Sequence, residues 1–132
     1  MKKVCVVLSE YGYWGEELVG PLDILDQAGF TSVFVTPKGK RAHALPPSMD
    51  ASYVDPPLGR PVVSEEMAEK VKELEASSRL ENPLSLADML PERPYLSSTD
   101  YIRKLEDYYH ELEAVEEKLG EYDALLLVGG SG

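Results

Sequence analysis

Three short runs of almost purely apolar residues constrain the fold of this chain more than any other feature of its sequence. They lie within residues 4–8, 31–36 and 122–128, where the continuous apolar parts are VCVVL, VFV and ALLLV. A strand with one face in water alternates apolar and polar residues, whereas a strand of a parallel sheet is covered on both faces and shows continuous runs like these. The sequence therefore predicts an α/β fold with a parallel sheet whose strands are buried.

A helix is predicted between the first two runs. Its apolar residues recur at near-helical spacing, and Gly29 follows them as a stop signal. These apolar residues are Leu18, Val19, Leu22, Ile24 and Leu25. Pro21 falls near the first turns of the helix. The strand, the helix and the second strand form one β-α-β unit, for which we expect the usual right-handed crossover.

A proline-rich loop and a capped helix come next. Residues 37–63 contain several prolines and almost no periodicity, which is typical of a loop. Ser64 can cap a helix that ends near Ala76, and the acidic Glu65 and Glu66 would lie favourably in its first turn.

A longer charged helix is predicted closer to the end of the chain. It begins at Ser98 or Thr99 and ends at Leu119, and a short helical turn over residues 85–90 precedes it. We expect residues 64–119 as a whole to form a helical insertion that packs outside the sheet.

The 132 residues fit one domain, but three strands do not complete it. The last apolar run leads directly into Gly129 and Gly130, a turn that should open a further helix. Three parallel strands with this much apolar surface do not close a doubly wound sheet. We therefore expect residues 1–132 to be the amino-terminal part of a single domain, unable to fold stably without the rest.

Composition excludes some classes of partner. The chain has 13 basic and 24 acidic side chains, a net charge of -11, which disfavours nucleic acid and anionic membranes. The apolar run at residues 4–8 is too short for a secretion signal, and no stretch approaches membrane-spanning length. A single cysteine fits a reducing compartment. We expect a cytoplasmic protein.

The glycine turn after the third run is the first candidate for chemistry. Ligands of open α/β sheets bind at the carboxyl ends of the strands, where Gly129 and Gly130 lie. Glycines allow backbone N–H groups to converge on an anion or an oxyanion. A plain tight turn explains the same residues, and both interpretations stay open at this point.

Two adjacent acids are the second candidate. Glu16 and Glu17 stand at the start of the first helix, at the same edge of the sheet as the glycine turn. They can serve only as partners of the helix dipole in water. A carboxylate near an electrophile or a thiol can instead act as a general acid or base.

Aromatic residues gather beside these acids. Tyr11, Tyr13 and Trp14 lie in the same loop, where they either line a small substrate pocket or cover the edge of the core.

The remaining reactive side chains are less promising. Cys5 lies within the first strand, where a cysteine is usually an inert small apolar residue. His43 falls in the proline-rich loop and His110 on the charged helix, so both are expected at the surface. No Cys/His cluster has zinc-site spacing, and we expect no metal and no cofactor.

Several blocks of sequence together resemble the ThiJ/PfpI family of the class I glutamine amidotransferase-like superfamily, and in particular its glyoxalase III and heat-shock chaperone branch. The blocks are GYWGEELVGP at 12–21, AGF at 28–30, VFVTPKG at 33–39, VDP at 54–56 and YDALLLVGGSG at 122–132. Residues 64–119 match only as a helical insertion. The resemblance implies a flavodoxin-like three-layer sandwich with a parallel sheet, incomplete in this chain.

The resemblance also implies roles for individual residues. A glutamate four positions before the helix proline lies against the family's catalytic cysteine, and this position is Glu17, with Glu16 as the fallback. The backbone N–H of Gly130 corresponds to the oxyanion-hole donor, while Gly129 shapes the turn. The cysteine itself lies on a strand-to-helix elbow downstream of the glycines, and no residue of this chain corresponds to it.

These roles predict the amino-terminal part of a cysteine-dependent hydrolase, hydratase or glyoxalase III-type lyase that acts on a small carbonyl or amide-like substrate. Trp14, Tyr13 and Gly129 would contact the substrate. The expected partner is the carboxyl-terminal half of the same fold as a separate chain, with a dimer of the completed domain as the higher assembly. The alternatives are a non-catalytic binding or chaperone-like protein on the same fold and, less favoured, a truncated domain used only for association.

Overall fold

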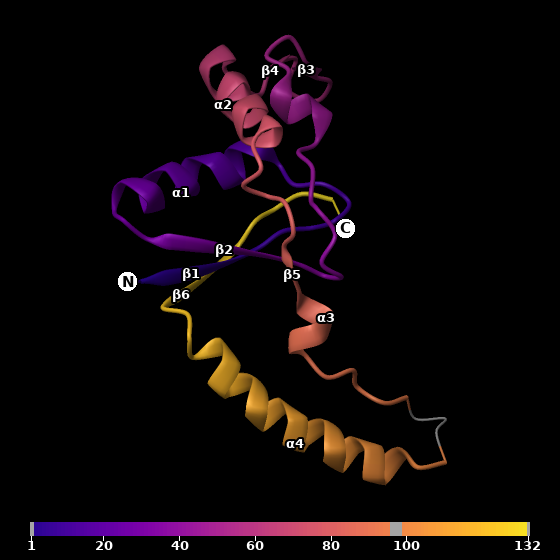
Figure 1. Ribbon diagram of the computed structural model, residues 1–132. Coiled ribbons are helices and arrows are strands. Elements are labelled where there is room, and N and C mark those ends of the chain that lie inside the picture. The colour runs from indigo at the N-terminus through magenta and orange to yellow at the C-terminus, as the bar shows by residue number, and fades with distance from the viewer. Residues whose placement is uncertain (1, 96–98, 132) are drawn as a thin grey trace.

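A parallel sheet organises the chain, as the apolar runs predicted. The computed structural model describes residues 2–95 and 99–131. Its four-stranded sheet contains β1 (Lys3–Val7), β2 (Thr31–Thr36), β5 (Leu84–Ser85) and β6 (Ala124–Leu127) in the order β5-β2-β1-β6. All neighbouring strands are parallel. The sheet and its flanking helices form the predicted α/β, flavodoxin-like fold (Figure 1).

The core lies between the sheet and the helix that follows β1. This helix, α1 (Gly15–Gln27), buries Leu18, Val19 and Leu22 against Val4 and Val6 of β1. Apolar residues at positions i, i+1 and i+4 share one face of a helix, which explains why the local pattern predicted this packing.

The second helix forms a layer outside the first. α2 (Glu65–Ala76) begins as predicted after Ser64, whose hydroxyl oxygen accepts a hydrogen bond of 3.1 Å from Met67 N. It packs on α1 rather than on the sheet (Figure 1). The approach is close, because a Cβ on Gly15 of α1 would lie 2.5 Å from Cγ1 of Val71.

The proline-rich segment has more structure than a plain loop. It contains a 3₁₀ turn, η1 (Pro46–Met49), and a small antiparallel hairpin of β3 (Val54–Asp55) and β4 (Arg60–Pro61). Two-residue strands are too short to show a period, so the sequence could not reveal them.

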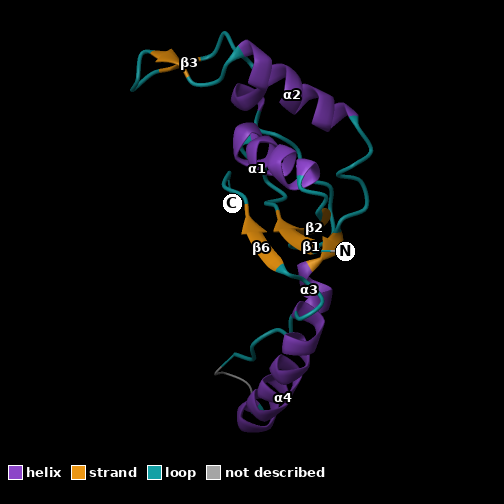
Figure 2. Ribbon diagram, turned by 90° about the vertical axis from the view of Figure 1, so that its left-hand side faces the viewer, coloured by secondary structure: helices purple, strands orange, loops and turns teal. Residues whose placement is uncertain are grey.

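The region expected to be a helical insertion is mainly helical, but β5 lies within it and pairs with β2, so the prediction that all of residues 64–119 pack outside the sheet was wrong. α3 (Leu86–Met89) is the predicted short turn. α4 (Tyr101–Leu119) begins at Tyr101, so the predicted start at Thr99 was wrong, and Ser98 lies outside the described residues. α4 projects away from the sheet on the side opposite α1 (Figure 2). Of the helices in the described part of the chain, none is long and apolar enough to cross a membrane.

Within the described residues the last strand lacks the cover on both faces that its apolar run predicted. β6 is an edge strand, with Leu125 and Leu127 62% and 70% exposed, while Leu126 packs against the core. An apolar groove of about 700 Å³ runs between α1 and β6 and includes Pro21 and Ile24. The apolar run indicates that both faces of this strand need to be covered by other elements. In the described part of the chain, no element packs beside the free edge of β6.

Candidate functional site

A glycine turn at the carboxyl edge of the sheet joins the loop that follows β1. Gly129 and Gly130 come directly after β6, and parallel strands end on the same edge. Trp14 N donates a hydrogen bond of 2.9 Å to the carbonyl oxygen of Gly129, and Ser131 N donates one of 3.0 Å to that of Gly12. These bonds hold the loop and the turn together as a short antiparallel pair.

The centre of this pair fixes the direction of one N–H group. Tyr13 and Gly130 face each other there, and such residues point their N–H and C=O groups away from the partner segment. The outward groups of Tyr13 bond to a third segment: its N donates to His43 O at 3.1 Å, and its O accepts from Leu45 N at 2.8 Å. The N–H of Gly130 is therefore turned away from Tyr13, toward the open side of the turn.

The two glycines of the turn have different surroundings, and only Gly130 is packed against backbone. A Cβ on Gly130 would overlap the carbonyl oxygen of Gly12 and lie 2.7 Å from the Cα of Tyr13, so backbone fills that space. A Cβ on Gly129 would overlap the carboxylate of Glu17, and its three nearest atoms all belong to this side chain. The Glu17 carboxylate therefore lies directly against the turn.

Glu17 reaches the glycine turn from the first turn of α1. Its side chain and that of Glu16 are both exposed, and the positive end of the helix dipole stabilises a carboxylate there. Glu17, and not Glu16, supplies the atoms nearest to the Cβ position of Gly129. The structure thus brings together the acid and the glycines that the sequence singled out.

A polar network that sequence reasoning missed includes the hydroxyl of Tyr13. At its centre is the carboxylate of Glu75, near the end of α2, which is only 16% exposed. Its Oε1 accepts hydrogen bonds from the hydroxyl of Tyr13 at 2.7 Å and from Ala44 N at 2.6 Å. Nδ1 of His43 lies 3.2 Å from its Oε2. In the sequence, Glu75 is one of several acids on a charged helix, and no local pattern indicates this role.

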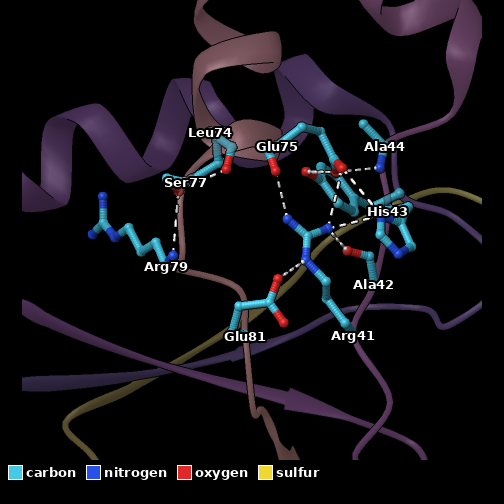
Figure 3. A network of polar contacts seen from close by, with 10 residues as sticks. Arg41, Ala42, His43, Ala44, Leu74, Glu75, Ser77, Arg79 and Glu81 are labelled. Carbon is cyan, nitrogen blue, oxygen red and sulfur yellow. Dashed lines mark hydrogen bonds and ion pairs between the residues drawn. The ribbon is translucent and has the colours of Figure 1, made fainter.

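Arg41 holds the same carboxylate from a second direction. One of its nitrogens, Nη1, donates to Oε2 of Glu75 at 3.1 Å, and Nη2 donates to the backbone oxygen of Glu75 at 2.7 Å. Its Nε also donates to Glu81 at 2.8 Å. The guanidinium thus binds both the side-chain carboxylate and the backbone oxygen of Glu75 (Figure 3).

The network shifts the pKa values of Glu75 and Tyr13. Burial acts to raise the pKa of Glu75, but the hydrogen bonds from Tyr13, Ala44, His43 and Arg41 outweigh it and hold this pKa below the ordinary value. Burial, and then the bond to the negative carboxylate, raise the pKa of Tyr13 well above that of a free tyrosine. At neutral pH the pair is therefore a tyrosine hydroxyl bonded to a carboxylate.

The aromatic residues of the loop do not share one role. Tyr13 is completely buried, so of the two interpretations left open it covers the core and does not line an open pocket. Tyr11 is 84% exposed, and Trp14 is half-buried beside the glycine turn. The assignment of Tyr13 as a substrate contact is corrected accordingly, because its ring packs inward and its hydroxyl bonds to Glu75.

The other reactive side chains stay outside this site. Cys5 is buried in β1, as predicted, and burial raises the pKa of its thiol. His43 is largely exposed but contacts Arg41 and Glu75, while His110 is exposed on α4. Across residues 2–95 and 99–131, no group of three or more His, Cys, Asp or Glu side chains could hold a metal ion.

Comparison with known proteins gives one match. A family model described as ThiJ/PfpI family-like covers residues 8–132, a range that includes the expected insertion at 64–119. Neither the curated proteins nor the solved structures contain a match to this chain.

Replacement of the two glycines should have different effects. Gly130→Ala forces backbone against backbone, so we expect it to lower the free energy of unfolding by about 1–3 kcal/mol. Gly129→Ala meets only the end of a flexible side chain and should cost less than about 0.5 kcal/mol. Urea unfolding of both variants measures the difference. Equal losses would contradict this account of the turn.

Because of Glu75, the free energy of unfolding should depend on pH in the acid range. A carboxyl whose folded pKa is lowered stabilises the protein above its unfolded pKa of about 4.3, and this contribution disappears as the pH falls through the folded pKa. The gap in unfolding free energy between wild type and Glu75→Gln should therefore narrow from pH 6 to pH 3 in urea titrations. A gap of constant size would show that the network does not lower this pKa.

Proposed function

The chain belongs to the ThiJ/PfpI-like family, and from this premise we propose that it forms the amino-terminal part of a cysteine-dependent active site. The family has a class I glutamine amidotransferase-like fold, and its members are generally cysteine-dependent enzymes. In this proposal Glu17 is the acid or base of the site, and the backbone N–H of Gly130 is the oxyanion donor.

One observation carries the proposal. The carboxylate of Glu17 lies against Gly129, and the next residue, Gly130, turns its N–H away from the neighbouring backbone. A carboxylate that can transfer a proton and a backbone N–H that points away from Tyr13 thus lie side by side at the edge where open α/β sheets bind their ligands.

The nucleophile of the proposed site comes from outside these residues. Cys5 is the only cysteine of the chain, and it is buried with a raised pKa, which disfavours the reactive thiolate. We assign the nucleophile to the carboxyl-terminal half of the same fold, on a partner chain, with a dimer of the completed domain as the higher assembly.

The last strand supports this partner. Sheets of this type continue in the order 2-1-3-4-5, so the strand after the third adds beside it. β2, β1 and β6 correspond to the first three positions of that order, which leaves the edge of β6 for the next strand. The exposed Leu125 and Leu127 and the apolar groove beside α1 provide the surface that such a partner would cover.

The chemistry follows from the arrangement. The cysteine thiolate attacks the carbonyl carbon of a small carbonyl or amide-like substrate, and the oxygen that becomes negative accepts a hydrogen bond from Gly130 N. Glu17 transfers the proton that the reaction requires. The half-buried Trp14 contacts the substrate beside the turn. Hydrolase, hydratase and glyoxalase III-type lyase reactions all share this first step.

Substitution of the two adjacent glutamates tests the assignment. In the protein assembled with its partner half, Glu17→Gln should lower kcat/KM by about 10²–10⁴-fold on a panel of small ketoaldehydes, amides and esters. Glu16→Gln removes the same charge one residue away and should stay within about twofold of wild type.

Other outcomes would show which part of the proposed function is incorrect. Loss of activity in Glu16→Gln with retention in Glu17→Gln would transfer the role to Glu16. Wild-type protein that turns over no compound of the panel, yet suppresses aggregation of a denatured client protein, would support the non-catalytic chaperone-like alternative instead.

A further inference from the structure

We propose that Glu75 is a positioning residue, which holds the glycine turn in place through Tyr13. The proposal assigns a role to α2, which lies outside the α1 layer and contributes no atom to the proposed reacting centre. Its catalytic consequence rests on the proposed function, because it concerns the N–H of Gly130. Its structural part, the order of the glycine turn, does not.

The first link joins Glu75 to Tyr13. The ring of Tyr13 is completely buried, and a buried hydroxyl without a partner is costly, so the 2.7 Å bond to Glu75 Oε1 fixes where the side chain can lie. The same oxygen accepts from Ala44 N at 2.6 Å. One carboxylate oxygen therefore locates both Tyr13 and the segment that pairs with it.

The second link joins Tyr13 to Gly130. The backbone of Tyr13 is the middle of three neighbouring segments, paired with Ala44 on one side and with Gly130 on the other. The Cα of Tyr13 lies so close to Gly130 that no Cβ fits between them. A displacement of Tyr13 must therefore displace Gly130 and redirect its N–H group.

The third link makes Glu75 itself rigid. Arg41 binds its carboxylate and its backbone oxygen together, and Glu81 binds Arg41 in turn. A carboxylate held in this way does not reorient when one contact is lost, so it acts as a fixed reference point. Figure 3 shows Glu75 on α2 contacted from the segment that contains Arg41, His43 and Ala44, with Glu81 bonded to Arg41.

Removal of one oxygen atom tests the proposal. Tyr13→Phe keeps the buried ring and deletes only the hydroxyl, in the protein assembled with its partner half. Amide hydrogen exchange, followed by NMR with this chain isotopically labelled, reports the order of the turn through Trp14 N and Ser131 N, which bond to Gly129 O and Gly12 O. We expect exchange about 10-fold faster at both amides, and kcat about 10-fold lower with KM unchanged.

Three further variants separate positioning from general stability. Glu75→Leu removes both carboxylate oxygens, so it should reproduce the exchange pattern of Tyr13→Phe, and the double variant should add little, since both substitutions break the same contact. Leu74→Ala truncates a core side chain next to Glu75 and should lower the free energy of unfolding more than Tyr13→Phe does. After correction for that loss of global stability, the exchange rates of Trp14 N–H and Ser131 N–H should stay near those of wild type. If Glu75→Leu does not fold, Tyr13→Phe alone decides the question.

The outcomes are distinct. Unchanged exchange at Trp14 and Ser131 in Tyr13→Phe, or equal acceleration in Leu74→Ala, overturns the positioning role. Faster exchange in Tyr13→Phe without any wild-type turnover keeps the positioning role and refutes only the proposed function.

Discussion

The arrangement at the edge of the sheet depends on one buried carboxylate. A charged group that leaves water needs several donors, and Glu75 obtains them from the Tyr13 hydroxyl, Ala44 N and the guanidinium of Arg41. These donors come from two loops that are far from α2 in the sequence, so the requirement draws the three together. The backbone of Tyr13, once located, pairs with Gly130 and sets the glycine turn.

Close packing, in addition to the hydrogen bonds, fixes the position of the glycine turn. Gly130 leaves no room for a side chain against Gly12 and Tyr13, and Gly129 leaves room only for the carboxylate of Glu17. The acid and the backbone donor that we propose for catalysis therefore lie beside each other because a tight turn meets the start of α1. The edge of the sheet brings these elements together, and the packed glycines set their spacing.

Local patterns in the sequence predicted much of this fold. Continuous apolar runs gave the strands, and the chemistry of Ser64 gave the start of α2, because each signal lies within a few residues of its effect. The position of the glycines and of the pair Glu16 and Glu17 at one edge of the sheet marked them as candidates, and the family resemblance selected Glu17. The sequence could not show that Glu75 binds Tyr13, because that contact spans 62 positions and depends on how α2 docks. It also did not show that β6 is an exposed edge within this chain, since an apolar run indicates the need for cover and not its source.

A crystal structure of the protein assembled with its partner half tests the central claim most directly. The account predicts a cysteine sulfur from outside these residues within about 3.5 Å of the Glu17 carboxylate, with the N–H of Gly130 facing the same space. It would be contradicted by a structure in which Glu17 remains in solvent with no sulfur near it, or in which Glu16 approaches the thiol in its place.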